Sequence, residues 1–394
     1  MKFAHISDGH VGGWGDDRMR SLGEESFSNC IIECIKERVD FVLFCGDLFN
    51  TSVPPVDSFK LVVECLKNLS DVGIKFYYIA GSHDASSTGR TFLDIIETAG
   101  LGKNVMVASI NSDGLLNLSP VVDEKTGVSI FGICGRRSGL DKEYYEILDR
   151  HSLENVSGRK IFLFHTAISE LKPKGLENIG GVPLSFFPKN FDYYAGGHIH
   201  SRNIVVFDGF NIVYPGPVFP NSFSELEVLK FGSFVIVEDW VPRIVNIPTC
   251  PIQIVHINAD GLTSDDVVTR AKSVEVVQNS VILLRIYGRL FSGRASNISI
   301  GDIVNYYKNF GAFHVLRNTL GLNGDEFEDV KVPVGSIEDV EERVIRETSI
   351  GRIPEEYETS KKLLDFLSVE RLDGETVNSF ENRIVRDVDA LFGE

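Results

Sequence analysis

Short apolar segments that stop at polar residues recur along the first part of the chain. The first segment, Lys2–Ile6, alternates apolar and polar positions and stops at Ser7-Asp8-Gly9-His10. The second, Asp40–Cys45, is almost continuously apolar and stops at Gly46-Asp47. Short runs of this kind, bounded by turn-forming residues, are typical of buried β-strands. Residues two apart on an extended chain point the same way, so Asp8 and His10 are placed to share one ion.

Two segments with helical spacing separate these strands. Apolar residues recur every three or four positions in residues 22–38, and residues 57–69 repeat this spacing. A third strand, Ile74–Ala80, stops at Gly81-Ser82-His83-Asp84. Strands that alternate with such helices predict βαβ units on a largely parallel sheet, and hence an α/β fold. The polar stops are expected to meet, because sites in these folds form at the carboxyl ends of the strands.

The same pattern returns in the middle of the chain. Lys160–Phe164 is a predicted strand that ends at His165, and Phe191–Ala195 leads to Gly196-Gly197-His198-Ile199-His200. The two histidines of the second stop are again two residues apart, so they are expected to point the same way. A second set of ligand-type side chains therefore follows a second set of strands.

The composition changes near Pro248–Pro251. Before this point, Phe231–Val237 and Arg243–Ile247 predict antiparallel strands that close a second sheet. After it, a mixed pattern of strands and helices predicts a small α+β unit, and only helical patterns follow. These helical patterns cover residues 337–347, 354–367 and 374–391. We predict a main domain over residues 1–249, a cap domain over 250–333 and a helical tail over 334–394.

Composition narrows the class of protein. The chain has 394 residues, of which 43% are hydrophobic and 24% charged, so it is long enough for two or three domains. It has no apolar run of membrane-spanning length and no signal peptide, which predicts a cytoplasmic protein without a membrane partner. The six cysteines form no CxxC pair, which indicates reduced thiols. The net charge of −17 disfavours nonspecific coating of nucleic acid but suits a protein that concentrates divalent cations.

The polar residues that follow the predicted strands together indicate a metal centre. Five of the nine histidines lie in them, although a single histidine is more often structural. The collected residues are Asp8, His10, Asp47, His83, His165, His198 and His200. Carboxylate oxygens combined with imidazole nitrogens suit Mn²⁺, Fe²⁺ or Zn²⁺ better than Ca²⁺. A carboxylate such as Asp47 can bridge two ions about 3.5–4 Å apart, and such a pair activates water for phosphoester hydrolysis.

These motifs resemble the five signatures of the calcineurin-like metallophosphoesterases. The matching strings are Asp8-x-His10, Gly46-Asp47, Gly81-Ser82-His83-Asp84, His165 and Gly197-His198-x-His200. Within that superfamily, HISDGHVG, CGDLFN and GGHIH followed by YPGP are most similar to the SbcD-type nucleases of DNA double-strand-break repair. The resemblance implies a four-layer sandwich of two mixed β-sheets flanked by helices, with a small α+β cap and a helical tail.

The resemblance also implies roles for residues. One metal ion, taken as Mn²⁺, would be held by Asp8, His10, Asp47 and His200. A second would be held by Asp47, Ser82, His165 and His198. His83, oriented by Asp84, would stabilise the transition state or protonate the leaving oxygen. The cap would guide DNA ends to the metals, the tail would dock on an SMC-like ABC ATPase of the SbcC type, and the protein would form a homodimer.

Two positions depart from the family pattern. The third signature usually has Asn where this chain has Ser82, and a hydroxyl is a shorter and weaker neutral ligand. Asn50 stands where nucleases of this branch often have His, and an amide cannot act as a general acid. These departures bear on the rate and on exonuclease action, and they leave the predicted fold unchanged.

Basic residues outside the motifs are candidates for contacts with substrate. Arg136 follows the strand Val128–Cys134 and is a candidate phosphate contact, and so are Arg289 and Arg294 in a flexible loop of the cap. Asn50 is a fourth candidate. A solvated loop is the alternative for each of the arginines.

Three functions fit these observations. The first is a metal-dependent DNA nuclease, with exonuclease and endonuclease activity, that acts on double-strand ends together with the ATPase. The second is a phosphoesterase of the same superfamily that acts on small phosphodiesters. The third is a protein that tethers DNA ends, with catalysis weakened at Ser82 and Asn50. The histidines retained at the other ligand positions speak against the third, because a tether has no use for them.

Overall fold

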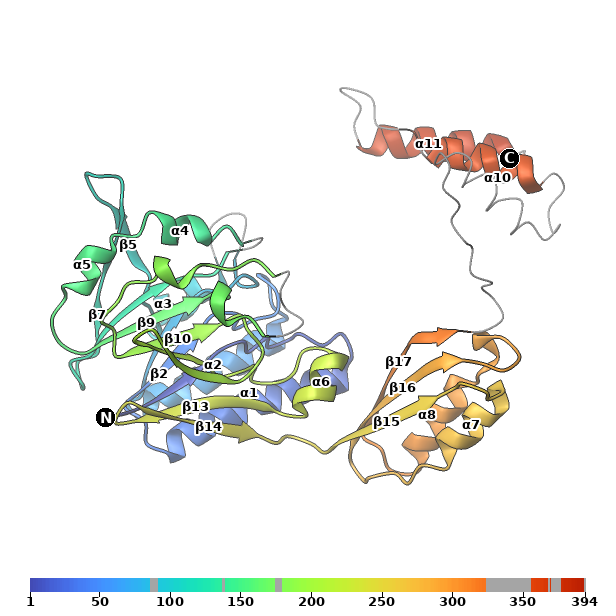
Figure 1. The fold of residues 1–394 in the computed structure, drawn as a ribbon, viewed down its shortest axis with the longest axis horizontal. Coiled ribbons are helices and arrows are strands. Elements are labelled where there is room, and N and C mark those ends of the chain that lie inside the picture. Colours follow the sequence, from blue (N-terminus) through green and yellow to red (C-terminus); the bar gives the residue numbers. More distant parts are fainter. Residues whose placement is uncertain are drawn as a thin grey trace. The chain divides into compact units, whose positions relative to one another are not determined.

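The structure is a computed structural model that describes residues 1–85, 91–136, 139–173, 179–323, 356–367, 369 and 377–392. Its first sheet has the strand order β14-β13-β1-β2-β3-β4. The strands are β1 (Lys2–Ile6), β2 (Phe41–Cys45), β3 (Lys75–Ile79), β4 (Lys103–Asn104), β13 (Gly232–Glu238) and β14 (Val241–Ile247). The neighbours β1, β2 and β3 are parallel, as predicted, with Phe3 opposite Phe41 and Phe41 opposite Lys75. Their carboxyl ends therefore lie at one edge of the sheet (Figure 1).

Strands β13 and β14 correct one prediction. They were expected to close a second sheet, but β13 pairs antiparallel with β1, with Val237 opposite Phe3, and extends the first sheet. The residues of β13 before Glu238 are all buried, which fits a strand inside a sheet. The apolar pattern identifies a buried strand, but it carries no information about which distant strand is its neighbour.

The second sheet has the strand order β11-β12-β10-β9-β8-β7. Its strands are β7 (Val121–Val122), β8 (Ser129–Ile133), β9 (Lys160–His165), β10 (Tyr193–Gly197), β11 (Asn203–Phe207) and β12 (Phe210–Tyr214). The central strands β8, β9, β10 and β12 are parallel, whereas β7 and β11 pair antiparallel at the two edges. A separate hairpin is formed by β5 (Val107–Ile110) and β6 (Leu116–Ser119).

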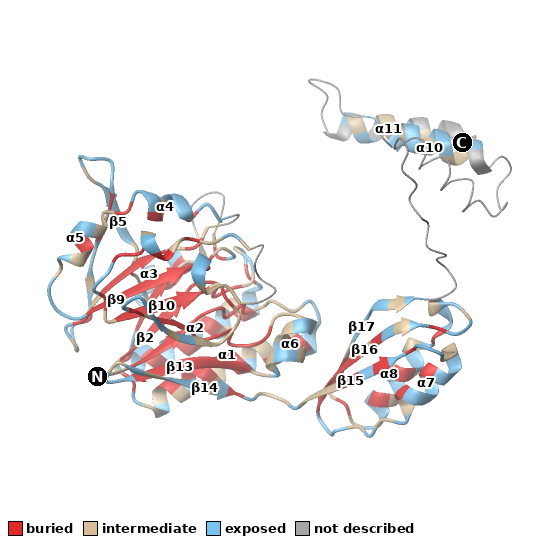
Figure 2. Ribbon diagram, in the orientation of Figure 1, coloured by how far each residue is buried: buried red, intermediate tan, exposed pale blue. Residues whose placement is uncertain are grey.

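Helices cover the outer faces of both sheets and give the four predicted layers. The first sheet is covered by α1 (Asp17–Lys36), α2 (Val56–Asp71) and α3 (Phe92–Thr98), which bury side chains such as Phe27 and Leu66 against it. The second is covered by the short α4 (Lys142–Glu146) and α5 (Arg150–Glu154) and by the 3₁₀ turns η2 (Ser169–Leu171) and η3 (Leu184–Phe186). Figure 2 shows buried residues concentrated along the strands and exposed ones on the outer surfaces of the helices.

The inner faces of the two sheets pack against each other. Leu43 and Ile79 of the first sheet share an apolar cluster with Leu163 and Ala195 of the second. One polar group, the fully buried His5 of β1, lies in this layer. Its Nε2 lies 3.2 Å from the carbonyl oxygen of Gly196 and its Nδ1 lies 3.0 Å from the Tyr193 hydroxyl, so two hydrogen bonds join the sheets.

The cap is the predicted α+β unit. Its sheet has the order β15-β16-β17, and two helices pack on it through Val267, Ala271, Ile303 and Tyr307. The elements are β15 (Ile252–Asn258), α7 (Ser264–Lys272), β16 (Val281–Arg289), η4 (Ala295–Asn297), α8 (Ile300–Asn309) and β17 (His314–Asn323). The helix α6 (Phe223–Leu229) of the sandwich contacts β15, and its Leu226 is buried with Val281 and Leu283 of the cap.

The tail contains two described helices, α10 (Glu356–Leu367) and α11 (Val377–Phe392), which contact each other. They belong to a second compact unit, whereas the sandwich and the cap together make the first. The predicted helix over residues 337–347 lies outside the described residues. None of the described helices is long and apolar enough to span a membrane. The division at residues 249/250 and 333/334 remains a proposal.

Candidate metal centre

The carboxyl ends of four strands bring the predicted ligands together. Asp8 follows β1, Asp47 follows β2 and His165 is the last residue of β9, while His198 and His200 follow β10. These strands belong to both sheets, and the inner layer between the sheets holds the two edges against each other. The structure therefore brings together Asp8, Asp47, His165 and His200, as the strand ends predicted, and His198 lies beside His165.

The backbone at the centre adopts an unusual conformation. Asp8, His10, Asp47 and His198 have positive φ angles of 52°, 40°, 56° and 81°. This left-handed region is uncommon for residues other than glycine, and such strain gathers at functional sites. Hydrogen bonds hold the conformation, because the amide of Asp8 donates to the Gly46 carbonyl and that of His10 to the Asp47 carbonyl, both at 3.0 Å. The strand ends are thus turned so that their side chains face one point.

Two glycines in the motifs allow the close approach. A Cβ atom at Gly81 would lie 2.2 Å from Asp47 Oδ1, and one at Gly197 would lie 2.0 Å from the Cys45 carbonyl oxygen. Neither distance is possible for a real side chain, and the atom met at Gly197 belongs to backbone. The motifs therefore need glycine at both positions for the ligands to come together.

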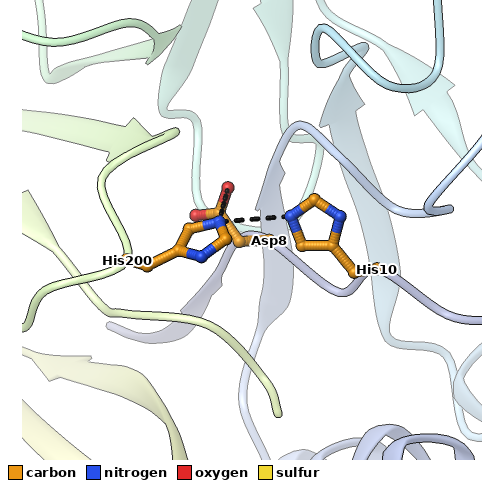
Figure 3. Close-up of side chains that lie close together, drawn as sticks. All are labelled: Asp8, His10 and His200. Atoms are coloured by element: carbon orange, nitrogen blue, oxygen red, sulfur yellow. Dashed lines mark hydrogen bonds and ion pairs between the residues drawn. The ribbon is translucent and has the colours of Figure 1, made fainter. Parts of the chain in front are cut away.

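One group of donor atoms consists of Asp8, His10 and His200 (Figure 3). His10 Nε2 lies 3.2 Å from His200 Nε2, and His200 Nε2 lies 3.6 Å from Asp8 Oδ1. Ser7 Oγ donates to Asp8 Oδ2 at 2.6 Å and the backbone amide of His198 donates to Asp8 Oδ1 at 3.0 Å, which fixes the carboxylate. Two imidazole nitrogens and a carboxylate oxygen facing one point match the ligand preference of Mn²⁺, Fe²⁺ or Zn²⁺.

A second group consists of Asp8, Asp47 and His165. His165 Nδ1 donates to the Cys45 carbonyl at 2.7 Å, because a carbonyl oxygen only accepts. In the neutral ring, Nε2 therefore presents a lone pair, and it lies 3.1 Å from Asp47 Oδ2. This buried Nε2 has no partner other than the Asp47 carboxylate. A buried lone pair beside a carboxylate fits coordination of a cation. Asp47 also belongs to a third group of donor atoms, together with His10 and His83.

Electrostatics at the centre favour a bound cation. Burial opposes the charge of Asp47, but His165 and His10 beside it hold the pKa of this carboxyl well below its usual range. Burial lowers the pKa of His10 to about 4, so this ring is neutral at pH 7. Burial opposes the charge of His165 and His200 as well, yet nearby carboxylates raise their pKa values to about 9 and about 10. Without a cation these two rings carry protons, so metal binding displaces protons from the centre.

Ser82 and His198 lie at the side of the second group. Both line a cavity of about 1010 Å³ that also exposes His83 and His165. The His198 ring lies 5.2 Å from the His165 ring, and burial lowers the pKa of His198 to about 4, which leaves a neutral imidazole. Their role as ligands remains a proposal, since neither belongs to the groups of close donor atoms.

The structure places His83 beside the centre but corrects the role of Asp84. His83 is exposed, and its Nδ1 donates to the Asn50 carbonyl at 2.7 Å. Asp84 is buried and instead accepts from the backbone amides of Leu48, Phe49 and Gly81 at 3.2, 3.0 and 2.9 Å. Burial and the Asp47 charge raise the pKa of Asp84 to about 6. Asp84 therefore joins two strand-end loops, and the Asn50 carbonyl orients His83.

The four candidate substrate contacts divide between two places. Asn50 and Arg136 line the cavity, and Arg136 also pairs with Glu143 at 3.4 Å. Arg289 lies in β16 of the cap and is not among the described residues that line the cavity, all of which belong to the sandwich. Arg294 lies in the segment Ser292–Ala295, which is grouped with the second compact unit. The local pattern of basic residues predicted a loop in the cap, but it could not show where this loop lies relative to the cavity.

Two further residues lie near the centre, and of these Glu225 was not predicted. Glu225 Oε1 lies 3.1 Å from His200 Nδ1, and the Asn221 side chain donates to Asn50 Oδ1 at 2.9 Å. The signal available was the string S-x-x-E at residues 222–225, which is a helix-start pattern. Ser222 Oγ does accept from the Glu225 amide at 3.2 Å, so the pattern is real. It does not reveal that the carboxylate also faces a histidine.

Comparison with known proteins agrees with this geometry. Residues 1–202 match the profile of the calcineurin-like phosphoesterases. The DNA double-strand break repair protein Mre11 of Methanococcus maripaludis is 32% identical over 238 residues, which cover 58% of this chain and 60% of that protein. Mre11 of Saccharolobus solfataricus is 28% identical over 298 residues, which cover 70% of this chain and 71% of that protein. The chain thus spans about three fifths of the length of the Methanococcus relative.

A likeness to a solved structure was also found. It is a dimetal phosphatase from Danio rerio, 10% identical, with a TM-score of 0.40 over 63% of this chain and 98% of that one.

Proposed function

Because the chain belongs to the calcineurin-like phosphoesterase family, we propose that it is a metal-dependent DNA nuclease that hydrolyses phosphodiester bonds at double-strand ends. The observation that carries the proposal is the set of overlapping donor groups around Asp8 and Asp47, whose members His83 and His165 open onto the cavity of about 1010 Å³. The Mre11 relatives are DNA double-strand break repair proteins, which supports DNA as the substrate. The family uses a dinuclear divalent-metal centre, and Mn²⁺ is the ion that we propose here.

The ligands divide into two sets in this proposal. Asp8, His10, Asp47 and His200 hold one ion, and Asp47, Ser82, His165 and His198 hold the other. When bound, the ions lower the pKa of a water molecule and neutralise charge on the phosphoryl oxygens. Asp8 and Asp47 anchor the centre, because their carboxylates are buried and fixed by hydrogen bonds from Ser7 Oγ and from the backbone amides of His198 and His83.

In this proposal, His83 donates a proton to the leaving oxygen or stabilises the charge that develops on it. Its Nδ1 hydrogen is held by the Asn50 carbonyl, so Nε2 is the atom available to the substrate. Arg136, on the cavity wall, is placed to contact a neighbouring phosphate, and its guanidinium lies over the Tyr144 ring at 5.2 Å. Asn50 positions His83 and has no acidic proton of its own to donate.

Partners are proposed from the tail and the resemblance. Leu367 of α10 and Val385 of α11 are 62% and 56% exposed, which leaves apolar surface on both helices. We propose that these helices dock on an SMC-like ABC ATPase and that the nuclease works as a homodimer. Residues Arg289 and Arg294 remain proposed DNA contacts of the cap.

A cleavage assay tests the function. The full chain is titrated with Mn²⁺ in the presence of an end-labelled DNA duplex, a small chromogenic phosphodiester serves as a second substrate, and Asp8→Asn is the inactive control. Mn²⁺-dependent cleavage of the duplex, absent in Asp8→Asn, is the expected result. Turnover of the small ester alone, without DNA binding, would favour a phosphodiesterase. Binding of DNA ends with two metals but no cleavage, with or without the ATPase, would favour a tether.

A further inference from the structure

The carboxylate of Glu225 is held between the metal centre and the start of a helix. Its Oε1 lies 3.1 Å from His200 Nδ1, and its Oε2 accepts from the Asn221 amide at 2.8 Å. Its own amide donates to Ser222 Oγ at 3.2 Å. The Glu225 side chain is 28% exposed, so solvent reaches it only in part. Both oxygens therefore have fixed partners, and the one that faces His200 has a defined position.

The geometry points to Glu225 as a positioning residue for the metal ligand His200. A carboxylate that accepts the Nδ1 hydrogen leaves the Nε2 lone pair for an ion and fixes the orientation of the ring. His200 Nε2 is the atom that faces Asp8 Oδ1 and His10 Nε2. This inference rests on the proposed metal centre and adds a residue to it that lies outside the family signatures quoted above.

The helix that carries Glu225 is itself held by the cap. Arg285 of β16 donates to both carboxylate oxygens of Glu227, from Nε to Oε1 at 2.8 Å and from Nη2 to Oε2 at 2.6 Å. His256 Nε2 lies 2.7 Å from Glu227 Oε1. The Arg285 guanidinium also lies over the Phe223 ring at 5.0 Å. In this way Glu225 faces the metal ligand while Glu227, two residues on, faces the cap.

Helix α6 depends on these contacts for its position. It spans seven residues, and helices this short are unstable without tertiary packing. Its Leu226 is fully buried in a cluster that joins Met19 and Leu22 of α1 to Val281 and Leu283 of the cap. Contacts from both α1 and the cap therefore set the place of Glu225 and, through it, the orientation of His200. Affinity for one of the two metal ions is expected to depend on the contact between the cap and α6.

Metal binding gives a direct test that does not need cleavage. Mn²⁺ binding to the full chain is followed by calorimetry and by electron paramagnetic resonance, for wild type, Glu225→Gln, Glu225→Asp and Arg285→Ala. His200→Ala marks the site concerned, and Glu64→Gln on the exposed surface of α2 is the matched control. Glu225→Gln is expected to weaken one of two sites by about tenfold or more, the usual effect of losing such a partner. Glu225→Asp is expected to lose less, because it keeps the charge, and Arg285→Ala is expected to weaken the same site severalfold.

The outcomes separate this inference from the proposed function. Unchanged Mn²⁺ affinity in folded Glu225→Gln and Glu225→Asp would overturn the role of Glu225, whatever the cleavage result. Weakened binding in Glu225→Gln but not in Arg285→Ala would overturn the link to the cap. Weakened binding in both variants, in a protein that cleaves no DNA, would support the inference while the nuclease proposal fails. Near-ultraviolet circular dichroism verifies that each variant is folded.

Discussion

The Nδ1 atom of His83 donates a hydrogen bond to the backbone carbonyl of Asn50 at 2.7 Å, across 33 residues of sequence. A carbonyl oxygen cannot donate, so this bond determines which ring nitrogen carries the hydrogen and leaves Nε2 facing the cavity. Asn50 is held in turn by the Asn221 side chain at 2.9 Å. The candidate acid is thus oriented by a backbone carbonyl, and the residue that carries this carbonyl is held through its own side chain.

Replacing His83 with Gln is expected to abolish most hydrolysis without loss of metal. General acid catalysis contributes about 10²–10⁴-fold, and glutamine has no proton to transfer. Cleavage of a labelled duplex at saturating Mn²⁺ gives the rate, and metal analysis of the same samples gives the stoichiometry. Glu64→Gln, on the exposed surface of α2, is the control. Wild-type rates in His83→Gln would exclude the proposed role.

Replacing Ser82 with Asn is expected to strengthen the second metal site. An amide oxygen reaches farther than a hydroxyl, and Ser82 lines the cavity beside His165 and His198. We expect the dissociation constant for the weaker Mn²⁺ to fall by about tenfold, and the cleavage rate to rise at limiting metal. Calorimetric titration measures the first effect. Ser82→Ala is the paired variant, and equal affinities in all three proteins would show that residue 82 is not a ligand.

Replacing Asp84 with Ala is expected to lower the stability of the fold and not only the rate of catalysis. The buried carboxylate accepts hydrogen bonds from three backbone amides, and its loss leaves those donors without partners. The cost is expected to be about 2–4 kcal/mol in the free energy of unfolding. Urea unfolding measures it, and Asp71→Ala on the surface of α2 is expected to change stability by less than about 0.5 kcal/mol. A stable but inactive Asp84→Ala protein would instead restore the predicted catalytic role.

The free energy of unfolding is expected to decrease as the pH is lowered, because His5 is buried as a neutral ring. Burial lowers the pKa of this histidine from 6.5 to about 3, so the folded protein keeps it neutral while the unfolded chain takes up a proton below pH 6.5. The unfolded state then binds more protons, so the stability present above pH 6.5 is lost as pH falls toward 3. At about 1.4 kcal/mol per pH unit, this group alone accounts for roughly 2 kcal/mol between pH 6.5 and 5.

The variant His5→Gln isolates this effect. It is expected to be less stable than wild type at pH 7, because the bonds to Tyr193 and Gly196 are weakened. The difference in unfolding free energy is expected to shrink as pH is lowered to 5, since glutamine does not titrate. Urea denaturation at both pH values measures it. A difference that stays constant with pH would show that folding does not shift the pKa of His5.

Local patterns predicted the parts of the centre that depend on local structure. The strand stops placed Asp8, Asp47, His165 and His200 correctly, because a strand that ends in a polar turn delivers its next side chain to a sheet edge. The position of β13 beside β1 was missed, because pairing of distant strands leaves no mark in either strand. Asp84 was misjudged for a related reason, since its partners are backbone amides up to 36 residues away.

The contribution of Glu225 was beyond a single sequence for a different reason. The spacing of Glu225 from Ser222 is fully explained by the start of α6, so the sequence contains no further signal for a contact with His200. Only the fold shows that this helix start lies against His200.

The central place of β1 in the first sheet has a consequence for biosynthesis. β1 leaves the ribosome before the other described strands, yet its neighbour β13 ends at Glu238, and the carbonyl of Asp8 accepts a hydrogen bond from the amide of Val218, which is made much later. Chains emerge from the amino terminus, at about 5–20 residues per second. A nascent chain therefore carries Asp8 and Asp47 for well over a hundred residues before His200 exists. The complete set of ligand-type side chains therefore exists only late in translation, and a chain stalled before His200 would lack it.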